Sequence, residues 1–194
     1  MSQVKVCGLM TPADIAIVNA VHPDYAGFVL AGGRHHVSDA TLRTLVAQLD
    51  PKICKVAVVV EPDCRHLIRL HDAGLIDAVQ LHRVSRKAVI AQLQQAGLMV
   101  IARIALTAPR TVADIALLDA GDGSGQTLDW SQLPSVTQPL MLAGGLDASN
   151  VQQAIRAVHP QIVDASSRLE TNGQKDAAKV TAYVTAVLNM KEES

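Results

Sequence analysis

Two residues at the ends of apolar runs have the chemistry to move protons. Cys7 closes the run VKVC and is followed by Gly8, whereas Asp119 closes the run DIALLD. A thiol can remove a carbon-bound proton while a carboxyl group protonates an oxygen, so the pair suits general acid–base catalysis. Lys5 would share a strand face with Cys7, and a nearby ammonium lowers a thiol pKa. Taken singly, each residue has a simpler structural interpretation. Cys7 fits a small residue of the core, and Asp119 fits a residue that caps a loop.

A second group of residues suits the binding of a phosphate. The motifs LAGGL and VDASS each follow an apolar run. Gly144 and Gly145 would let the backbone approach an anion closely, and the hydroxyls of Ser166 and Ser167 can add hydrogen-bond donors. A helix-entry turn and a helix cap use the same residue types. Two such turns at consecutive strand ends nevertheless favour a phosphate site.

These residues have to be positioned by strands that alternate with helices. Apolar, β-branched runs begin near eight positions, namely Val4, Tyr25, Ile53, Asp77, Leu98, Asp114, Pro139 and Gln161. Helical periodicity follows most of them, including residues 147–158 and 175–188, and Thr11 is a good N-cap for the first helix. An open doubly wound sheet would also alternate, but it usually has fewer strands.

The pattern therefore predicts the α/β class and a single (β/α)8 TIM-barrel domain over residues 1–194. The fifth and sixth strands are separated by about ten residues, the lower limit for a complete crossover, so helix five should be short or absent. The helix after Trp130 should also be short, because Pro134 follows soon after it.

In such a barrel, the active site lies at the carboxyl ends of the strands. The ends of the second, fourth and eighth strands supply further polar side chains, and we take Arg34, His35, His82 and Arg168 as candidate substrate-binding residues.

The composition excludes several classes of protein. The net charge is −1 and aromatic residues make up 2%, which disfavours a nucleic-acid surface or a base-stacking platform. The longest apolar runs, such as VAVVV, are too short to span a bilayer. The seven histidines are not at metal-ligand spacing, and the three cysteines form no CxxC motif. With no signal peptide at the N-terminus, a reduced, cytoplasmic setting is expected.

Several short blocks also occur in a distinctive order. They are KVCGL, GFVL, VQLH, LLD followed by GSGQTLDW, LAGGL followed by Asn150, and VDASS followed by Gly173–Asp176. In this order they resemble the phosphoribosylanthranilate isomerase family, from Val4 to about Lys179. The resemblance implies a (β/α)8 barrel without a cofactor. It also implies the conversion of N-(5-phosphoribosyl)anthranilate to an aminodeoxyribulose phosphate in tryptophan biosynthesis.

The resemblance also assigns roles and shows departures. By it, Cys7 is the general base that takes the proton from sugar C2, and Asp119 is the general acid that first protonates the ring oxygen. The family usually has an arginine for the anthranilate carboxylate where His35 stands here, and Arg34 lies one residue earlier. Arg168 replaces a glycine beside the expected phosphate. Its guanidinium could contact the phosphate, or it could block a backbone conformation that glycine supplied.

Three hypotheses stay open at this point. The first is the isomerase reaction of the family. The second is an enzyme with a shifted substrate, either a related aminoaldose phosphate or, in a dual enzyme, the analogous step of histidine biosynthesis. The third is a catalytically weak phosphate-ligand-binding subunit. Each expects a small phosphorylated partner, no nucleic acid and no membrane, and each allows a monomer or a homodimer.

Overall fold

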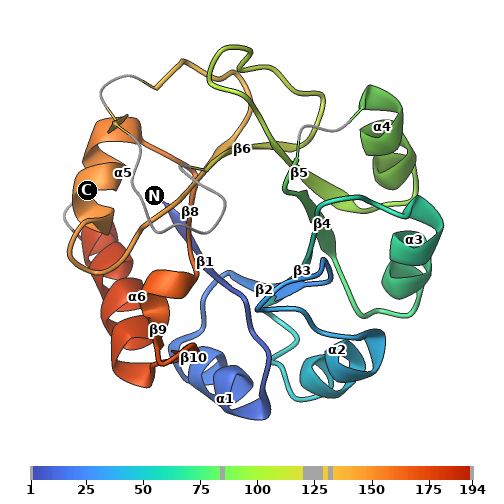
Figure 1. Ribbon diagram of the computed structural model, residues 1–194. Coiled ribbons are helices and arrows are strands. Elements are labelled where there is room, and N and C mark those ends of the chain that lie inside the picture. Colours follow the sequence, from blue (N-terminus) through green and yellow to red (C-terminus); the bar gives the residue numbers. More distant parts are fainter. Residues whose placement is uncertain (1, 84–85, 120–128, 131–132, 193–194) are drawn as a thin grey trace.

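A closed barrel of parallel strands forms the centre of the computed structural model, which describes residues 2–83, 86–119, 129–130 and 133–192. Eight strands pair in sequence order, and the last pairs with the first, so the predicted (β/α)8 barrel is confirmed (Figure 1). Every strand begins within one residue of its predicted start. The strands are β1 (Gln3–Cys7), β2 (Tyr25–Val29), β3 (Cys54–Val59), β4 (Ala78–Leu81), β5 (Met99–Arg103), β6 (Ile115–Asp119), β7 (Leu140–Ala143) and β8 (Ile162–Ala165).

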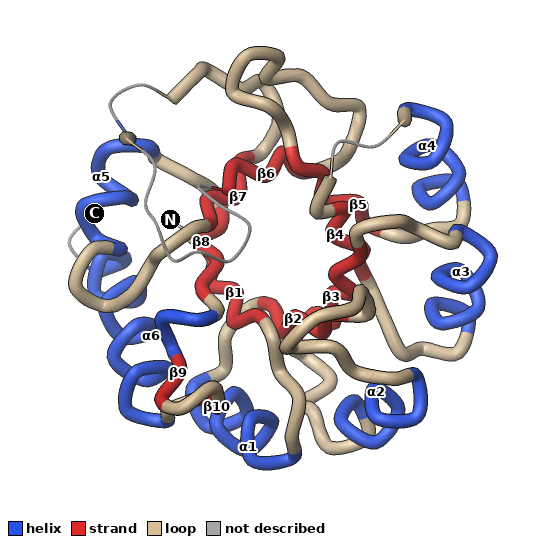
Figure 2. The backbone as a smooth tube through the Cα atoms, in the orientation of Figure 1, coloured by secondary structure: helices blue, strands red, loops and turns tan. Residues whose placement is uncertain are grey.

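Helices pack around the outside of the barrel (Figure 2). They are α1 (Pro12–Val21), α2 (Asp39–Val46), α3 (Cys64–Asp72), α4 (Lys87–Gln95), α5 (Val151–Val158) and α6 (Ala177–Glu192). The expected start of α1 is confirmed, because Thr11 accepts from the backbone of Asp14 and the Asp14 side chain accepts in return, which is a capping box.

The connection from β5 to β6 contains no helix, as its length predicted. It turns through a single bridge between Ala105 and Ala108. The predicted short helix after Trp130 and the glycine-rich stretch after Asp119 fall partly or wholly on residues 120–128 and 131–132, which lie outside the described residues.

Two of the predicted helix starts are wrong. Residues 147–150 form a turn, in which the Asn150 side chain donates to the carbonyl of Gly145 at 2.9 Å, so α5 begins only at Val151. The final helix begins at Ala177 rather than 175, because Lys175 pairs with Glu170 in a short antiparallel hairpin of β9 (Glu170–Thr171) and β10 (Gln174–Lys175).

Apolar side chains fill two separate layers. A large cluster lies between the strands and the helices, and a smaller one occupies the interior of the barrel. The interior cluster consists of Tyr25, Val56, Ala78, Ile101, Ile115, Leu117, Met141, Ala143 and Ile162. Lys5, Gln80 and Asp164 are also fully or almost fully buried. Buried polar groups need partners, so these three mark the part of the interior where chemistry is expected.

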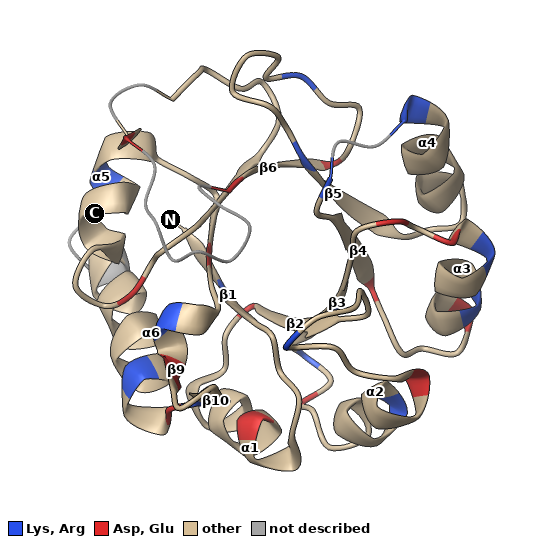
Figure 3. Cartoon of the chain, in the orientation of Figure 1, with Lys and Arg blue, Asp and Glu red and all other residues tan. Residues whose placement is uncertain are grey.

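Basic residues (Lys and Arg) and acidic residues (Asp and Glu) are interspersed around the barrel in the part of the chain that Figure 3 colours. None of the described helices has the length and apolar character that a membrane span requires. The three cysteines are free thiols, with Cys7 buried and the other two partly buried.

Candidate active site

One cavity lies at the carboxyl ends of the strands, where the barrel prediction puts the active site. Its volume is ≈ 660 Å³. All ten candidate residues line it, from the ends of β1, β2, β4, β6, β7 and β8: Cys7, Arg34, His35, His82, Asp119, Gly144, Gly145, Ser166, Ser167 and Arg168. The structure therefore gathers the candidates from the whole chain at one site.

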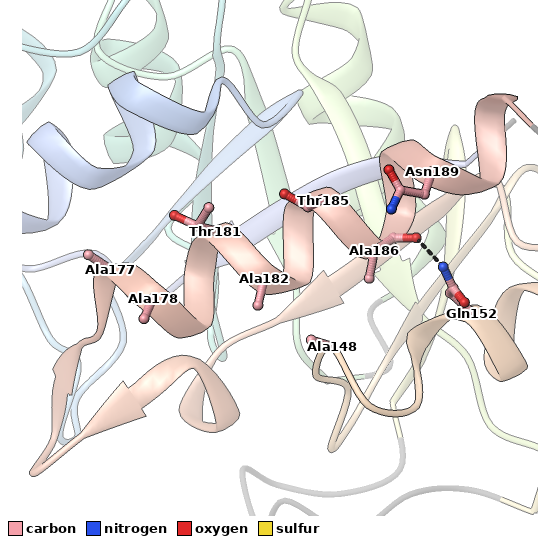
Figure 4. Close-up of a pocket in the computed structure, with 9 residues that line it drawn as sticks. All are labelled: Ala148, Gln152, Ala177, Ala178, Thr181, Ala182, Thr185, Ala186 and Asn189. Carbon is pink, nitrogen blue, oxygen red and sulfur yellow. Dashed lines mark hydrogen bonds between the residues drawn. The ribbon is translucent and has the colours of Figure 1, made fainter.

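A second hollow lies outside the barrel, between α6 and the start of α5 (Figure 4). Its lining is Ala148, Gln152, Ala177, Ala178, Thr181, Ala182, Thr185, Ala186 and Asn189, and Gln152 donates to the carbonyl of Ala186 at 3.0 Å. None of these side chains can exchange a proton at ordinary pH, so this hollow is not suited to acid–base chemistry.

Cys7 lies beside a buried ion pair formed by Lys5 and Asp164. Lys5 Nζ donates to Asp164 Oδ2 at 2.9 Å across the β1–β8 seam, and the Lys5 side chain is fully buried. Burial raises the pKa of the Cys7 thiol above its ordinary value, and Lys5 offsets only part of this effect. The expectation that Lys5 would lower the thiol pKa is therefore wrong in its net direction, because desolvation outweighs the ammonium and Asp164 opposes it.

Asp119 faces the cavity from the end of β6 and is held by a histidine. His82 Nε2 lies 3.0 Å from Asp119 Oδ2. His82 follows β4, so this contact joins two strand ends across the barrel mouth. A carboxylate only accepts, so Nε2 carries the hydrogen when Asp119 is ionised. The Asp119 side chain keeps an exposed fraction of 11%, which leaves it open to the cavity.

The two loops predicted to bind phosphate both adopt special backbone conformations. Gly144 and Gly145 have φ values of 95° and 64°, which L side chains rarely adopt. After β8, a short 3-10 helix begins at Ser167, with Ser166 in the capping position. The backbone N–H groups at its first turn lack helical partners of their own and can serve an anion.

Arg34 and His35 lie on the loop after β2, and both meet the same carboxylate. Arg34 Nη2 donates to Glu170 Oε2 at 2.9 Å, and His35 Nε2 lies 2.8 Å from Glu170 Oε1. Burial lowers the pKa of His35, and Lys175 and Arg34 lower it further, which outweighs Glu170. His35 is therefore a neutral donor at pH 7 rather than a second cation.

Arg168 lies in the 3-10 helix, and its guanidinium is 3.9 Å from Asp147 Oδ2. The described non-glycine residues with positive φ are His22, His159 and Asn172, so Arg168 has an ordinary backbone conformation. Of the two readings of this substitution, a blocked glycine conformation is therefore not supported. The side chain reaches the cavity rim and is half exposed.

Comparison with known proteins decides the family. Residues 4–186 match the family described as N-(5'phosphoribosyl)anthranilate (PRA) isomerase. The chain is 46% identical over 189 residues to the N-(5'-phosphoribosyl)anthranilate isomerase of Lacticaseibacillus casei (strain BL23), covering 95% of this chain and 94% of that one. This chain belongs to the phosphoribosylanthranilate isomerase family.

Solved structures agree with this assignment. The crystal structure of TrpF from Jonesia denitrificans superposes with a TM-score of 0.86 at 32% identity, covering 98% of both chains. The phosphoribosyl anthranilate isomerase of Thermus thermophilus gives a TM-score of 0.85 at 25% identity, covering 97% of this chain and 99% of that one. The barrel of this family member thus matches isomerase-family barrels over at least 97% of the chain.

Three further residues take part in the site of this family member without being among the ten candidates. Asp164 and Gln80 line the cavity, and Asp164 Oδ1 and Gln80 Oε1 are buried with no partner among the described residues. Glu170 was also missed. A usable signal existed for Asp164, because it lies in the motif VDASS two residues before Ser166, and residues two apart on an extended chain share a face. No local periodicity pointed to Glu170, whose carboxylate contacts Lys175 of the hairpin and Arg34 and His35 of the loop after β2.

Among the residues with described positions, no group of three or more His, Cys, Asp or Glu side chains is arranged to hold a metal ion.

Proposed function

We propose that this family member converts N-(5-phosphoribosyl)anthranilate to 1-(2-carboxyphenylamino)-1-deoxyribulose 5-phosphate, with Cys7 as general base and Asp119 as general acid. The observation that carries the proposal is that a buried thiol and a carboxyl group line one cavity from strands β1 and β6. Both of them lie at the carboxyl ends of their strands, where a substrate between them would meet one on each side.

The reaction is an internal redox exchange between two carbons. Asp119 gives a proton to the ring oxygen, the bond from that oxygen to C1 breaks, and C1 becomes the carbon of an iminium. Cys7, as thiolate, removes the proton from C2, which yields an enolamine. A proton then enters at C1 as the C2 hydroxyl loses its own, which leaves the ketone. The sum of the steps is an isomerisation, so no external oxidant or reductant enters.

The raised thiol pKa makes the Cys7 thiolate scarce but strongly basic. A base of high pKa removes a carbon-bound proton well once formed. Lys5 supports this role, because its ammonium lies beside both Cys7 and Asp164 and favours a negative charge on the sulfur. The Lys5 ammonium thus supplies the positive charge that the thiolate needs at the moment of proton transfer.

The remaining polar groups fit the two ends of such a substrate. The loops after β7 and β8, with Gly144, Gly145, Ser166 and Ser167, would hold the phosphate on backbone N–H groups. Arg34, on the loop after β2, would face the carboxylate of the aromatic ring. The unpaired oxygens of Asp164 and Gln80 can accept from the sugar hydroxyls and the bridging amine.

A turnover assay on N-(5-phosphoribosyl)anthranilate tests the proposal. The wild-type chain should convert it, and Cys7→Ser and Asp119→Asn should each lower turnover by at least about 10²-fold, the scale of a lost general base or acid. Cys64→Ser is the matched control, because Cys64 lies at the start of α3, outside the cavity, and this variant should keep full activity. Near-full activity in Cys7→Ser would overturn the assigned mechanism.

The same assay separates the other hypotheses. Turnover of a related aminoaldose phosphate, with none of the anthranilate compound, would mean a shifted substrate. Binding without turnover of either would mean a binding subunit.

A further inference from the structure

Glu170 joins basic side chains from two separate parts of the chain. Its carboxylate is almost fully buried, with an exposed side-chain fraction of 4%. Oε1 accepts from Lys175 Nζ at 2.7 Å and lies 2.8 Å from His35 Nε2, while Oε2 accepts from Arg34 Nη2 at 2.9 Å. Burial by itself raises the pKa of Glu170, but the bond from Lys175 and the neighbouring cations bring it below its ordinary value. The carboxylate is therefore ionised at neutral pH.

The partners of Glu170 connect it to two loops at the rim of the cavity, with Arg34 and His35 on the loop after β2 and Lys175 beside the end of β8. Lys175 also donates to the carbonyl of Ser166 at 3.3 Å, at the end of β8. The ring of His35 lies against Gly8, because a Cβ added at Gly8 would stand 3.2 Å from its Cγ and 2.9 Å from Ser166 Oγ. His35 and Ser166 thus flank the residue that follows Cys7.

The hairpin that carries Glu170 is anchored without its carboxylate. Lys179 Nζ donates to the Glu170 carbonyl, Asp176 N donates to the Leu169 carbonyl at 2.9 Å, and Thr171 Oγ1 donates to Asp176 Oδ2 at 2.7 Å. The carboxylate is consequently left for the contacts across to the loop after β2.

We propose that Glu170 is a positioning residue of the isomerase site, which fixes the loop after β2 against the loop after β8 and so sets both substrate-holding rims with one side chain. The proposal rests on the proposed function. Glu170 lies behind His35 and Arg34 and acts through them and through Lys175, without contact to the reacting atoms. Its role concerns the spacing of the two rims, so it should affect substrate binding more than the proton transfers.

Glu170→Gln tests this, because glutamine has the same shape but offers one acceptor oxygen and a donating NH₂ group to three donors. At least one basic partner loses its acceptor. We expect the Michaelis constant for N-(5-phosphoribosyl)anthranilate to rise about tenfold or more, the scale of a lost charge-assisted hydrogen bond, while kcat changes by less than about threefold. Gln174→Ala is the matched control, because Gln174 is exposed in the same hairpin, and it should leave both constants unchanged.

Amide hydrogen exchange gives a readout that does not depend on activity. In Glu170→Gln, exchange should become faster both at residues 31–36 and at residues 166–168, and stay at the wild-type rate in β4, on the far side of the barrel. Faster exchange in only one of the two loops, or a uniform rise that includes β4, would overturn the proposal. The proposal would also be overturned if Glu170→Gln kept the wild-type exchange rates and the wild-type Michaelis constant while the wild-type chain turned over substrate normally. Absence of wild-type turnover would instead overturn the proposed function.

Discussion

The sulfur of Cys7 lies directly against Gly27 of the neighbouring strand. A Cβ added at Gly27 would stand 2.7 Å from Cys7 Sγ and 3.0 Å from its Cα. The two residues are register partners in the parallel pairing of β1 with β2. The space that the thiol occupies therefore exists because residue 27 has no side chain.

Gly27→Ala should impair the thiol without removing it. The added methyl group must displace Cys7 or spread β1 from β2, and overpacking of this kind costs about 1–3 kcal/mol of stability. We expect kcat to fall about tenfold or more, because small displacements of a catalytic group weaken catalysis strongly. Steady-state kinetics and thermal denaturation check both effects. Gly32→Ala is the control for stability, since a Cβ there meets nothing within 4 Å.

Alkylation should report the raised pKa of Cys7. Because burial raises that pKa above the ordinary 9.0 and Lys5 offsets only part of the rise, the reactive thiolate is a small fraction at pH 7. The rate of iodoacetamide labelling at Cys7, followed by mass spectrometry, should rise steadily from pH 7 to about pH 9 and beyond. Cys54, whose pKa is raised by burial to about 12, should stay unlabelled over the same range. A plateau below pH 8 at Cys7 would show a thiol of low pKa instead.

Lys5→Met should be strongly destabilising. It removes one partner of the buried pair and leaves the Asp164 carboxylate without its ammonium. Breaking such a pair costs about 3–5 kcal/mol, which corresponds to a fall in Tm of roughly 10 °C in a domain of this size. The double variant Lys5→Met, Asp164→Asn removes the stranded charge and should recover part of the lost stability. Equal stability of the single and double variants in urea denaturation would contradict the account of the pair.

Arg168→Ala should weaken binding of the phosphorylated substrate. The guanidinium lies at the cavity rim beside the loop of Ser166 and Ser167, and its backbone conformation does not require glycine. Loss of one charge-assisted contact predicts a Michaelis constant about tenfold higher and weaker inhibition by inorganic phosphate, with kcat little changed. Arg156→Ala on α5, outside the cavity lining, is the control. Improved activity of Arg168→Ala would mean that the side chain obstructs the site.

The barrel could be predicted because its signal repeats along the chain. Eight apolar runs at similar intervals specify the strands, and closure of the sheet then brings their carboxyl ends together whatever the details of each loop. This is why Cys7 and Asp119 could be paired before any geometry was known. The absence of a helix in the short connection after β5 could also be predicted, since about ten residues cannot hold a full crossover helix.

Features that depend on desolvation or on local turns could not be predicted in the same way. Adjacency of Lys5 and Cys7 on a strand face suggested a lowered thiol pKa, but its net direction depends on burial and on Asp164, which the sequence places far away. The start of α5 depends on a side-chain bond from Asn150 that competes with the helix. The position of Glu170 depends on the pairing of two strands of two residues each, which brings it beside Lys175. Strands this short give no periodic pattern in the sequence.

The pairing of β1 with β8 has a consequence for the growing chain on the ribosome. The same seam that closes the barrel brings Lys5 to Asp164, so the surroundings of Cys7 are assembled from the first and last barrel strands to be synthesised. A nascent chain that ends between residues 119 and 164 carries the candidates Cys7 and Asp119 but lacks the partner of Lys5. Products truncated within that stretch should therefore be unable to turn over the substrate.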